Sequence, residues 1–202
     1  MDADGCLDKI FFPDSGVVSV VAVYPDGSMI GMETIGREGC AGVQAVFGAK
    51  RSSMRLFVQI PCAATQMSRA SFERGMAELP AFRSLMYAYF QAFLEQVMVS
   101  AACSGAHSVK QRLARWLLMM RDRSDDDALP VTQNLLAEML GVQRPTISIA
   151  ARELEHADLI ERRRRQLRIG DRKGLERASC ECYEIARTRM AHHLPKTYTS
   201  EA

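Results

Sequence analysis

Side chains suited to contacting nucleic acid gather in the C-terminal half of this 202-residue chain, within a pattern typical of two short helices. Thr132 is a good N-cap for a helix over residues 133–140, because its hydroxyl can accept a hydrogen bond from a free backbone N–H. Gly141 then supplies a residue that tolerates the positive φ of a tight turn. Pro145 suits the first turn of a second helix that starts near Arg144. Three residues between two helices predict a helix-turn-helix.

The outward side of the second predicted helix carries hydrogen-bonding and cationic groups. A helix that lies in the major groove of DNA needs such groups to contact base edges and phosphates. The inward side is apolar, and Ala137 is small where the two helices would touch. We therefore predict that the DNA-contacting residues of the two helices are Thr132, Gln133, Gln143, Arg144, Pro145, Thr146, Ser148 and Arg152.

A basic hairpin is expected after the second helix. Two short runs typical of strands, at residues 159–161 and 167–169, flank four consecutive arginines. This pattern predicts the wing of a winged helix, with cations along the phosphate backbone: Arg162, Arg163, Arg164 and Arg165. The alternatives are a solvated charge run and a helix pair with no role in DNA binding.

The net charge of +2 conceals an asymmetry between the two halves of the chain. Residues 1–106 contain 8 basic and 10 acidic residues, whereas residues 107–202 contain 18 basic and 14 acidic residues. Nine of the basic residues lie between positions 144 and 173. A basic patch confined to one region indicates a polyanionic partner.

The first 60 residues are expected to form strands separated by turns. β-rich runs cover residues 10–12, 17–23, 29–35, 43–47 and 54–60, and segments rich in Gly, Pro and Asp separate most of them. Runs at this spacing predict a compact antiparallel barrel or sandwich.

Helices should follow these strands, first a short one over residues 69–78 and then a long one that begins at Pro80. The long helix has an apolar face broader than a small barrel would cover. We expect part of it to pack on a copy of itself, with burial inside the monomer as the alternative. The expected dimer-interface residues are Phe82, Met86, Tyr89, Phe90, Phe93 and Val97. Another helix is expected over residues 108–123, with a domain boundary near residues 104–107.

Enzymatic and metal-binding patterns are weak in this sequence. It contains no phosphate-binding GxxxxGK[ST] loop, HExxH motif or recognisable catalytic triad, so we expect no enzyme. Cys180 and Cys182 have His192 and His193 nearby and could bind a metal, but a single CxC lacks the paired spacing of a zinc site. We interpret them as small buried thiols and predict no metal site. Scattered cysteines and the lack of a long apolar run predict a cytoplasmic protein without a membrane segment.

Three groups of motifs together resemble the Crp/Fnr family of bacterial transcription regulators. They are the Phe-Phe-Pro-Asp-Ser-Gly segment at residues 11–16, Gly36-Arg37-Glu38-Gly39 with Gly42, and the Arg-Pro-Thr-Ile-Ser segment at 144–148 that leads to Leu154 and Asp158-Leu159-Ile160. The resemblance implies an α+β protein with an N-terminal antiparallel β-roll of the cyclic-nucleotide-binding type over residues 1–79. A dimerisation helix over residues 80–106 and a winged helix-turn-helix domain over residues 107–202 would follow.

The residues expected to bind an effector depart from the family pattern. Cyclic-nucleotide-binding members place a glutamate after a glycine to hold the ribose, whereas Gly42 is followed here by Val43, which cannot accept a hydrogen bond. Arg51 and Ser52 fall near the family's phosphate-binding pair, so an anion could still bind there. Only twelve residues precede Pro13, fewer than in family β-rolls, so either the start codon was chosen late or the β-roll lacks its first strands.

These observations favour a sequence-specific transcription regulator that binds double-stranded DNA as a homodimer at a roughly palindromic site and contacts RNA polymerase. The alternative is a ligand-sensing or protein-interaction module whose winged helix contacts protein instead of DNA.

Overall fold

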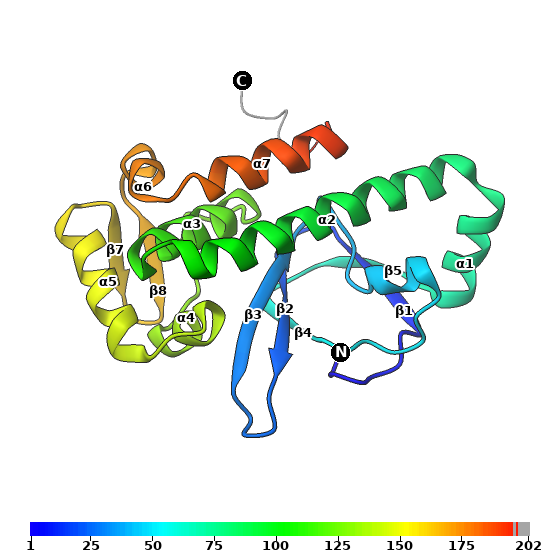
Figure 1. The fold of residues 1–202 in the computed structure, drawn as a ribbon, viewed down its shortest axis with the longest axis horizontal. Helices are drawn as coiled ribbons and strands as arrows, with labels where there is room; N and C mark the ends of the chain where they lie inside the picture. Colours follow the sequence, from blue (N-terminus) through cyan, green and yellow to red (C-terminus); the bar gives the residue numbers. More distant parts are fainter. Residues whose placement is uncertain (196, 198–202) are drawn as a thin grey trace.

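A computed structural model describes residues 1–195 and 197. Helix α2 (Pro80–Ala106) runs along the length of the molecule, from the N-terminal strands to the C-terminal helices (Figure 1). The last helix, α7 (Cys182–His193), packs alongside it. None of the helices in the described part of the chain combines the length and apolar character needed to span a bilayer.

The N-terminal strands form two small antiparallel sheets. β1 (Lys9–Pro13) pairs with β5 (Ala64–Ser68), and β2 (Val17–Val23) lies between β3 (Met29–Ile35) and β4 (Arg55–Ile60). The β-branched sequence of β2 suits a central strand, and its first five residues are all buried. The predicted antiparallel β-structure is therefore confirmed.

One local prediction in this region is wrong, and one strand was not predicted. Residues 43–47 were expected to be a strand but form the 3₁₀ helix η1 (Val43–Phe47). The reason lies in the flanking glycines, because Gly42 at φ +101° and Gly48 at φ +75° adopt left-handed conformations that interrupt an extended chain. Strand β5 was not predicted, and its mostly exposed residues explain why, since they lack an apolar alternation.

The helices begin and end close to their predicted positions. Helix α1 (Arg69–Glu78) is capped by Ser68, whose side chain accepts a hydrogen bond from the Ser71 N–H. Pro80 occupies the first turn of α2. Helix α3 (Val109–Asp122) begins with a capping box between Ser108 and Gln111.

The predicted dimer face of α2 is partly covered by its own protomer. Met86 and Tyr89 are only 5% and 2% exposed and belong to a core formed by η1, α1, α2 and α7. Phe82 packs edge-on against Phe72, and Phe90 packs edge-on against Phe47. The two remaining residues of the predicted face, Phe93 and Val97, are half-buried. Burial within the monomer therefore accounts for Met86 and Tyr89, and a dimer role for the other four residues stays a prediction.

The C-terminal part contains four further helices and a three-stranded sheet. The helices are α4 (Gln133–Leu140), α5 (Arg144–His156), α6 (Arg172–Ala178) and α7. The sheet has the strand order β6 (Ala128–Leu129), β8 (Gln166–Ile169) and β7 (Ile160–Arg163), all antiparallel. This is the predicted winged helix-turn-helix architecture.

One hydrophobic core joins the β-structure to the C-terminal helices. Val17 and Val21 of β2 belong to the same buried cluster as residues of α3, α4 and α5. Helix α4 lies beside β3, and a Cβ atom on Gly31 would come within 2.8 Å of the Met139 carbonyl oxygen. The two parts of the chain are thus in direct contact as well as linked through α2.

A buried ion pair adds a polar connection between the same two parts. Arg123, the C-cap of α3, donates from Nε to Glu38 Oε1 at 2.7 Å, and both side chains are nearly inaccessible to solvent. Arg123 also donates to the Met119 carbonyl and to Gln96 of α2. The turn after β3 is therefore tied to both α2 and α3.

Candidate DNA-binding interface

The helix-turn-helix forms where local sequence signals predict it. Thr132 caps α4 by accepting a hydrogen bond from the Leu135 N–H at 3.2 Å. Gly141 ends α4 at φ +61°, a conformation that glycine adopts at little cost. Pro145 lies in the first turn of α5. A three-residue turn thus joins α4 to α5.

One face of α5 is buried in the core, and this packing fixes the direction of the opposite, exposed face. Ile147, Ala150, Ala151 and Leu154 are buried against the C-terminal core. Gln143, Arg144, Pro145, Thr146 and Arg152, all predicted to contact DNA, are exposed. The exposed face therefore presents two arginines and several hydrogen-bonding groups toward solvent.

Ile149 was not among the residues predicted to contact DNA. It lies on the exposed face between Pro145 and Arg152, and 59% of its surface is accessible. An exposed isoleucine on a DNA-facing helix can contact the methyl group of thymine. Ile149 could have been noticed in the sequence, because it is apolar at a position where the helical period predicts a polar, exposed residue.

Ser148, also predicted to contact DNA, is half-buried and hydrogen-bonded within the helix-turn-helix. Its hydroxyl lies 2.9 Å from Gln133 Oε1 and 3.1 Å from the Arg144 carbonyl oxygen, and it can donate to either. Gln133 is the first residue of α4. This interaction links α4 to α5, so Ser148 helps to position the two helices, and its predicted contact with DNA stays a prediction.

The wing is a tight hairpin whose turn consists of two arginines. Arg163 pairs with Gln166 across the hairpin, which leaves Arg164 and Arg165 in the connection. Arg165 adopts the left-handed conformation, with a φ of +64°. Within residues 1–195 and 197, Arg164 and Arg165 make no ion pair. Their charges are therefore free to attract an anion.

The other two arginines of the wing have carboxylate partners. Arg162 donates to Glu155 of α5, with 2.8 Å between Nε and Oε2. This hydrogen bond lowers the pKa of the Glu155 carboxyl below its usual value, so the pair stays charged at neutral pH. Arg163 pairs with Glu161 at 3.0 Å, and both side chains are more than half exposed. Arg162 thus anchors the wing to α5, whereas Arg163 can exchange its partner for a phosphate at little cost.

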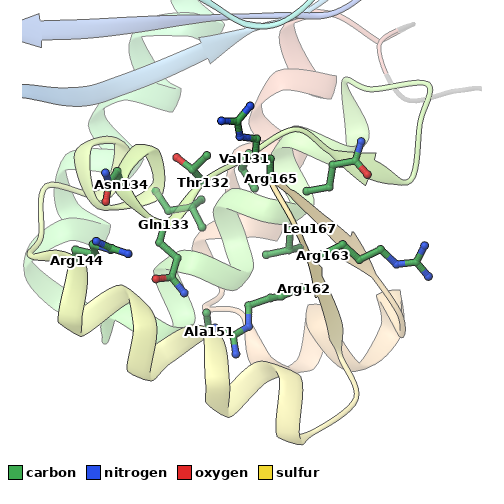
Figure 2. A pocket seen from close by; sticks show the side chains of 12 residues that line it. Val131, Thr132, Gln133, Asn134, Arg144, Ala151, Arg162, Arg163, Arg165 and Leu167 are labelled. Carbon is green, nitrogen blue, oxygen red and sulfur yellow. The ribbon is translucent and has the colours of Figure 1, made fainter.

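A hollow of about 320 Å³ lies between α4, α5 and the wing (Figure 2). Thr132, Gln133 and Asn134 line it from α4 and the residue before it, and Arg144 lines it from α5. Arg162, Arg163 and Arg165 of the wing line the remaining side. Six of the residues predicted to contact DNA are therefore gathered around one open, cation-rich surface.

The predicted effector residues are engaged within the chain. Gly42 is the N-cap of η1, and the neighbouring Val43 is 2% exposed. The Ser52 side chain is fully buried, and its hydroxyl donates to the Met54 carbonyl at 2.7 Å. Arg51 donates from Nε to the Asp4 carbonyl at 2.7 Å. The Ser52 hydroxyl is consequently not available to a phosphate.

The fold and this surface define a protein in which a long helix connects a small β-structure to a winged helix-turn-helix. Residues 111–178 match the family model of the Crp-like helix-turn-helix domain. No curated protein matches the sequence.

Solved structures with a similar fold are transcription regulators. A CRP-family transcriptional regulator from Thermus thermophilus, TTHB099, is 18% identical with a TM-score of 0.70, and the match covers 89% of this chain and 95% of that one. FixK2 from Bradyrhizobium japonicum is 16% identical with a TM-score of 0.75, covering 89% and 91%. The c-di-GMP-responsive global regulator CLP from Xanthomonas campestris is 16% identical with a TM-score of 0.63, covering 85% and 88%.

The resemblance to Crp/Fnr transcription regulators is therefore confirmed, in the fold of the chain and in its Crp-like helix-turn-helix domain.

Proposed function

We propose that this chain is a sequence-specific transcription regulator that binds double-stranded DNA as a homodimer at a roughly palindromic site. The observation that carries the proposal is the exposed cationic surface formed by α5 and the wing. In this arrangement α5 lies in the major groove, where Arg144, Ile149 and Arg152 contact bases. Arg164 and Arg165 contact the phosphate backbone and contribute affinity without sequence preference.

The proposed dimer interface is the exposed face of α2, opposite to the one predicted from the sequence. Tyr87, Leu94 and Met98 are 49%, 40% and 60% exposed, which is unusual for large apolar side chains on one helix. Their spacing of seven and then four residues matches the apolar repeat of a two-stranded coiled coil. Exposed Ala101 and Gly105 continue this seam and would allow close helix contact. Two recognition helices would then reach half-sites about 34 Å apart.

The remaining parts of the proposal concern the partners and the effector. We place the regulator in the cytoplasm, where it would act together with RNA polymerase. Its effector differs from a cyclic nucleotide bound in the usual way, because buried Val43 offers no acceptor for a ribose and Ser52 is already hydrogen-bonded. The hypothesis of a protein-binding winged helix predicts no dependence on DNA sequence, which the following experiment tests.

Selection of bound duplexes from a random pool, followed by anisotropy titrations of the selected DNA, tests this function. The full chain should bind the selected duplex more tightly than a scrambled one, and added salt should weaken both complexes. Arg144→Ala should cost about 1–3 kcal/mol on the selected duplex and relax its sequence preference. Equal affinity for selected and scrambled duplexes would contradict sequence-specific binding.

Substitution of the wing arginines separates phosphate contacts from base contacts. Arg164→Ala together with Arg165→Ala should weaken binding to all sequences and flatten the salt slope by about 0.9 for each lost phosphate contact. Arg74→Ala, which removes an exposed arginine from α1, is the matched control and should leave the slope unchanged. An unchanged slope in the wing variant would show that the wing does not contact phosphate.

A further inference from the structure

Three cysteines and one histidine from distant parts of the sequence meet where α2 ends and α7 begins. Cys103 lies in the last turn of α2, and His107 is the C-cap of that helix. Cys180 lies between α6 and α7, and Cys182 is the first residue of α7. The four potential ligand atoms all lie within 4.8 Å of one another. We call these four residues the Cys₃His cluster.

The distances within the Cys₃His cluster are close to those of a tetrahedral zinc site. Zn–S bonds of about 2.3 Å and Zn–N bonds of about 2.0–2.1 Å place two sulfurs about 3.8 Å apart and a sulfur and a nitrogen about 3.6 Å apart. Here Cys103 Sγ lies 3.4 Å from Cys180 Sγ, and Cys182 Sγ lies 3.7 Å from His107 Nδ1. Only small side-chain movements would be needed to place an ion at the centre.

The orientation of His107 is the second observation that points to a metal. Its Nε2 lies 3.2 Å from Glu181 Oε1, while its Nδ1 faces Cys182. When Nε2 donates to the carboxylate, the lone pair of Nδ1 is directed toward the cysteines. A carboxylate that orients a histidine in this way is typical of zinc ligands.

The surroundings favour a thiophilic ion and offset its charge. Cys103, Cys180 and Cys182 are 0%, 3% and 7% exposed, so the thiolates would be shielded from water. Three thiolates and one Zn²⁺ sum to one negative charge. Arg115 is buried and interacts electrostatically with all three cysteines, and within the described residues its Nε has no hydrogen-bond partner. Sulfur and imidazole ligands select zinc over hard cations such as Mg²⁺ or Ca²⁺.

We propose that Cys103, His107, Cys180 and Cys182 bind one zinc ion that joins the C-terminal end of α2 to the N-terminal end of α7. On binding, the three thiols lose their protons to the solvent and the imidazole binds in its neutral form. Helix α3 starts at Val109, two residues after His107, so the ion fixes the point where the helix-turn-helix part leaves α2. The sequence alone pointed to His192 and His193 as the histidines near these cysteines, whereas His193 contacts Glu95 near the other end of α7.

The metal site is tested without DNA on the reduced, full-length chain after chelation of bound metal. Titration with Co²⁺ should give the thiolate-to-metal charge-transfer and intense d–d absorption of a tetrahedral site, saturating at one ion per chain. Zn²⁺ should displace the cobalt. Cys180→Ser should lose this spectrum, whereas Cys62→Ser, a half-buried cysteine between β4 and β5, should retain it.

A milder variant keeps the test valid if Cys180→Ser does not fold. Glu181 is exposed and would not bind the ion directly, so Glu181→Gln should fold and bind zinc about 10–100-fold more weakly in competition with a chromophoric chelator. Failure of the wild-type chain to bind a stoichiometric ion would overturn the proposal. Unchanged cobalt spectra in Cys180→Ser, or unchanged zinc affinity in Glu181→Gln, would also overturn the zinc proposal.

The zinc site does not rest on the proposed function, but its effect on DNA binding does. The zinc-loaded chain should bind the selected duplex more tightly than the chelated chain, because the ion orders the start of α3. Metal binding without any DNA binding would leave the zinc site standing and contradict the proposed regulator. DNA binding without metal binding would support the proposed regulator and contradict the zinc site.

Discussion

Replacement of Arg123 by alanine tests how strongly the turn after β3 is tied to the C-terminal helices. Arg123 is 3% exposed and donates to the Glu38 carboxylate, the Met119 carbonyl and the Gln96 side chain. Removing the cation leaves the carboxylate of Glu38, whose side chain is 6% exposed, without its charged partner. Loss of one member of a buried pair costs about 3–5 kcal/mol of unfolding free energy.

This cost predicts a large shift in the melting temperature. For a chain of about 200 residues, each kcal/mol lowers Tm by roughly 2–4 °C, so Arg123→Ala should lower it by about 6–20 °C. Thermal unfolding followed by circular dichroism, at fixed protein and metal concentrations, measures the shift. The matched control is Arg37→Ala, which removes an exposed pair with Asp125 between the same two segments and should cost about 0–1 kcal/mol.

Two outcomes decide whether burial is the cause. A shift in Arg123→Ala no larger than that in Arg37→Ala would refute the reasoning. The double variant Arg123→Met with Glu38→Leu removes both charges while keeping apolar volume, and it should recover most of the lost stability. If the double variant is less stable than the single one, an uncompensated carboxylate is not the source of the loss.

Three further predictions address the dimer, the wing and the turn. Leu94→Glu places a charge in the exposed seam of α2 and should give monomers in sedimentation experiments. The control Tyr24→Glu should remain dimeric. A dimeric Leu94→Glu chain would exclude this seam as the dimer interface. The hydrogen bond from Arg162 lowers the pKa of Glu155 below 4.5, so the stabilisation from this pair is present above about pH 4.5 and is lost as the pH falls through the pKa of the folded state. The Tm difference between wild type and Glu155→Gln should accordingly shrink in acid, and a difference that is constant with pH would contradict this assignment. Gly141→Ala forces a Cβ into a conformation with φ +61° and should cost about 1–2 kcal/mol in urea unfolding; an unchanged denaturation midpoint would show that the turn relaxes.

Features set by neighbouring residues were predictable from the sequence. Thr132, Gly141 and Pro145 act on their own backbone or that of the next turn, and the structure places α4 and α5 where these residues predict them. Helix α1 likewise occupies its predicted range, residues 69–78. The roles of the DNA-contacting residues and the division into three parts stay predictions.

Features that depend on distant residues were not predictable from local patterns. The apolar stripe of α2 is wide enough for two partners, and only the packing of η1, α1 and α7 shows which side the protomer itself covers. The link between Ser148 and Gln133, fifteen residues away, likewise forms only once α4 and α5 are packed together. Cys103 and Cys180 are 77 positions apart, so no spacing rule connects them before the fold is known.

The core shared by β2 and the helix-turn-helix determines how much free energy is needed to separate these two parts of the chain. Moving α4 away from the sheet would expose buried side chains such as Met139 and Val21, at roughly 1.5–3 kcal/mol each. An effector that drives this movement must therefore bind the opened form about two to four orders of magnitude more tightly than the packed one. A ligand that binds both forms equally would leave the recognition helix in place, however tightly it binds.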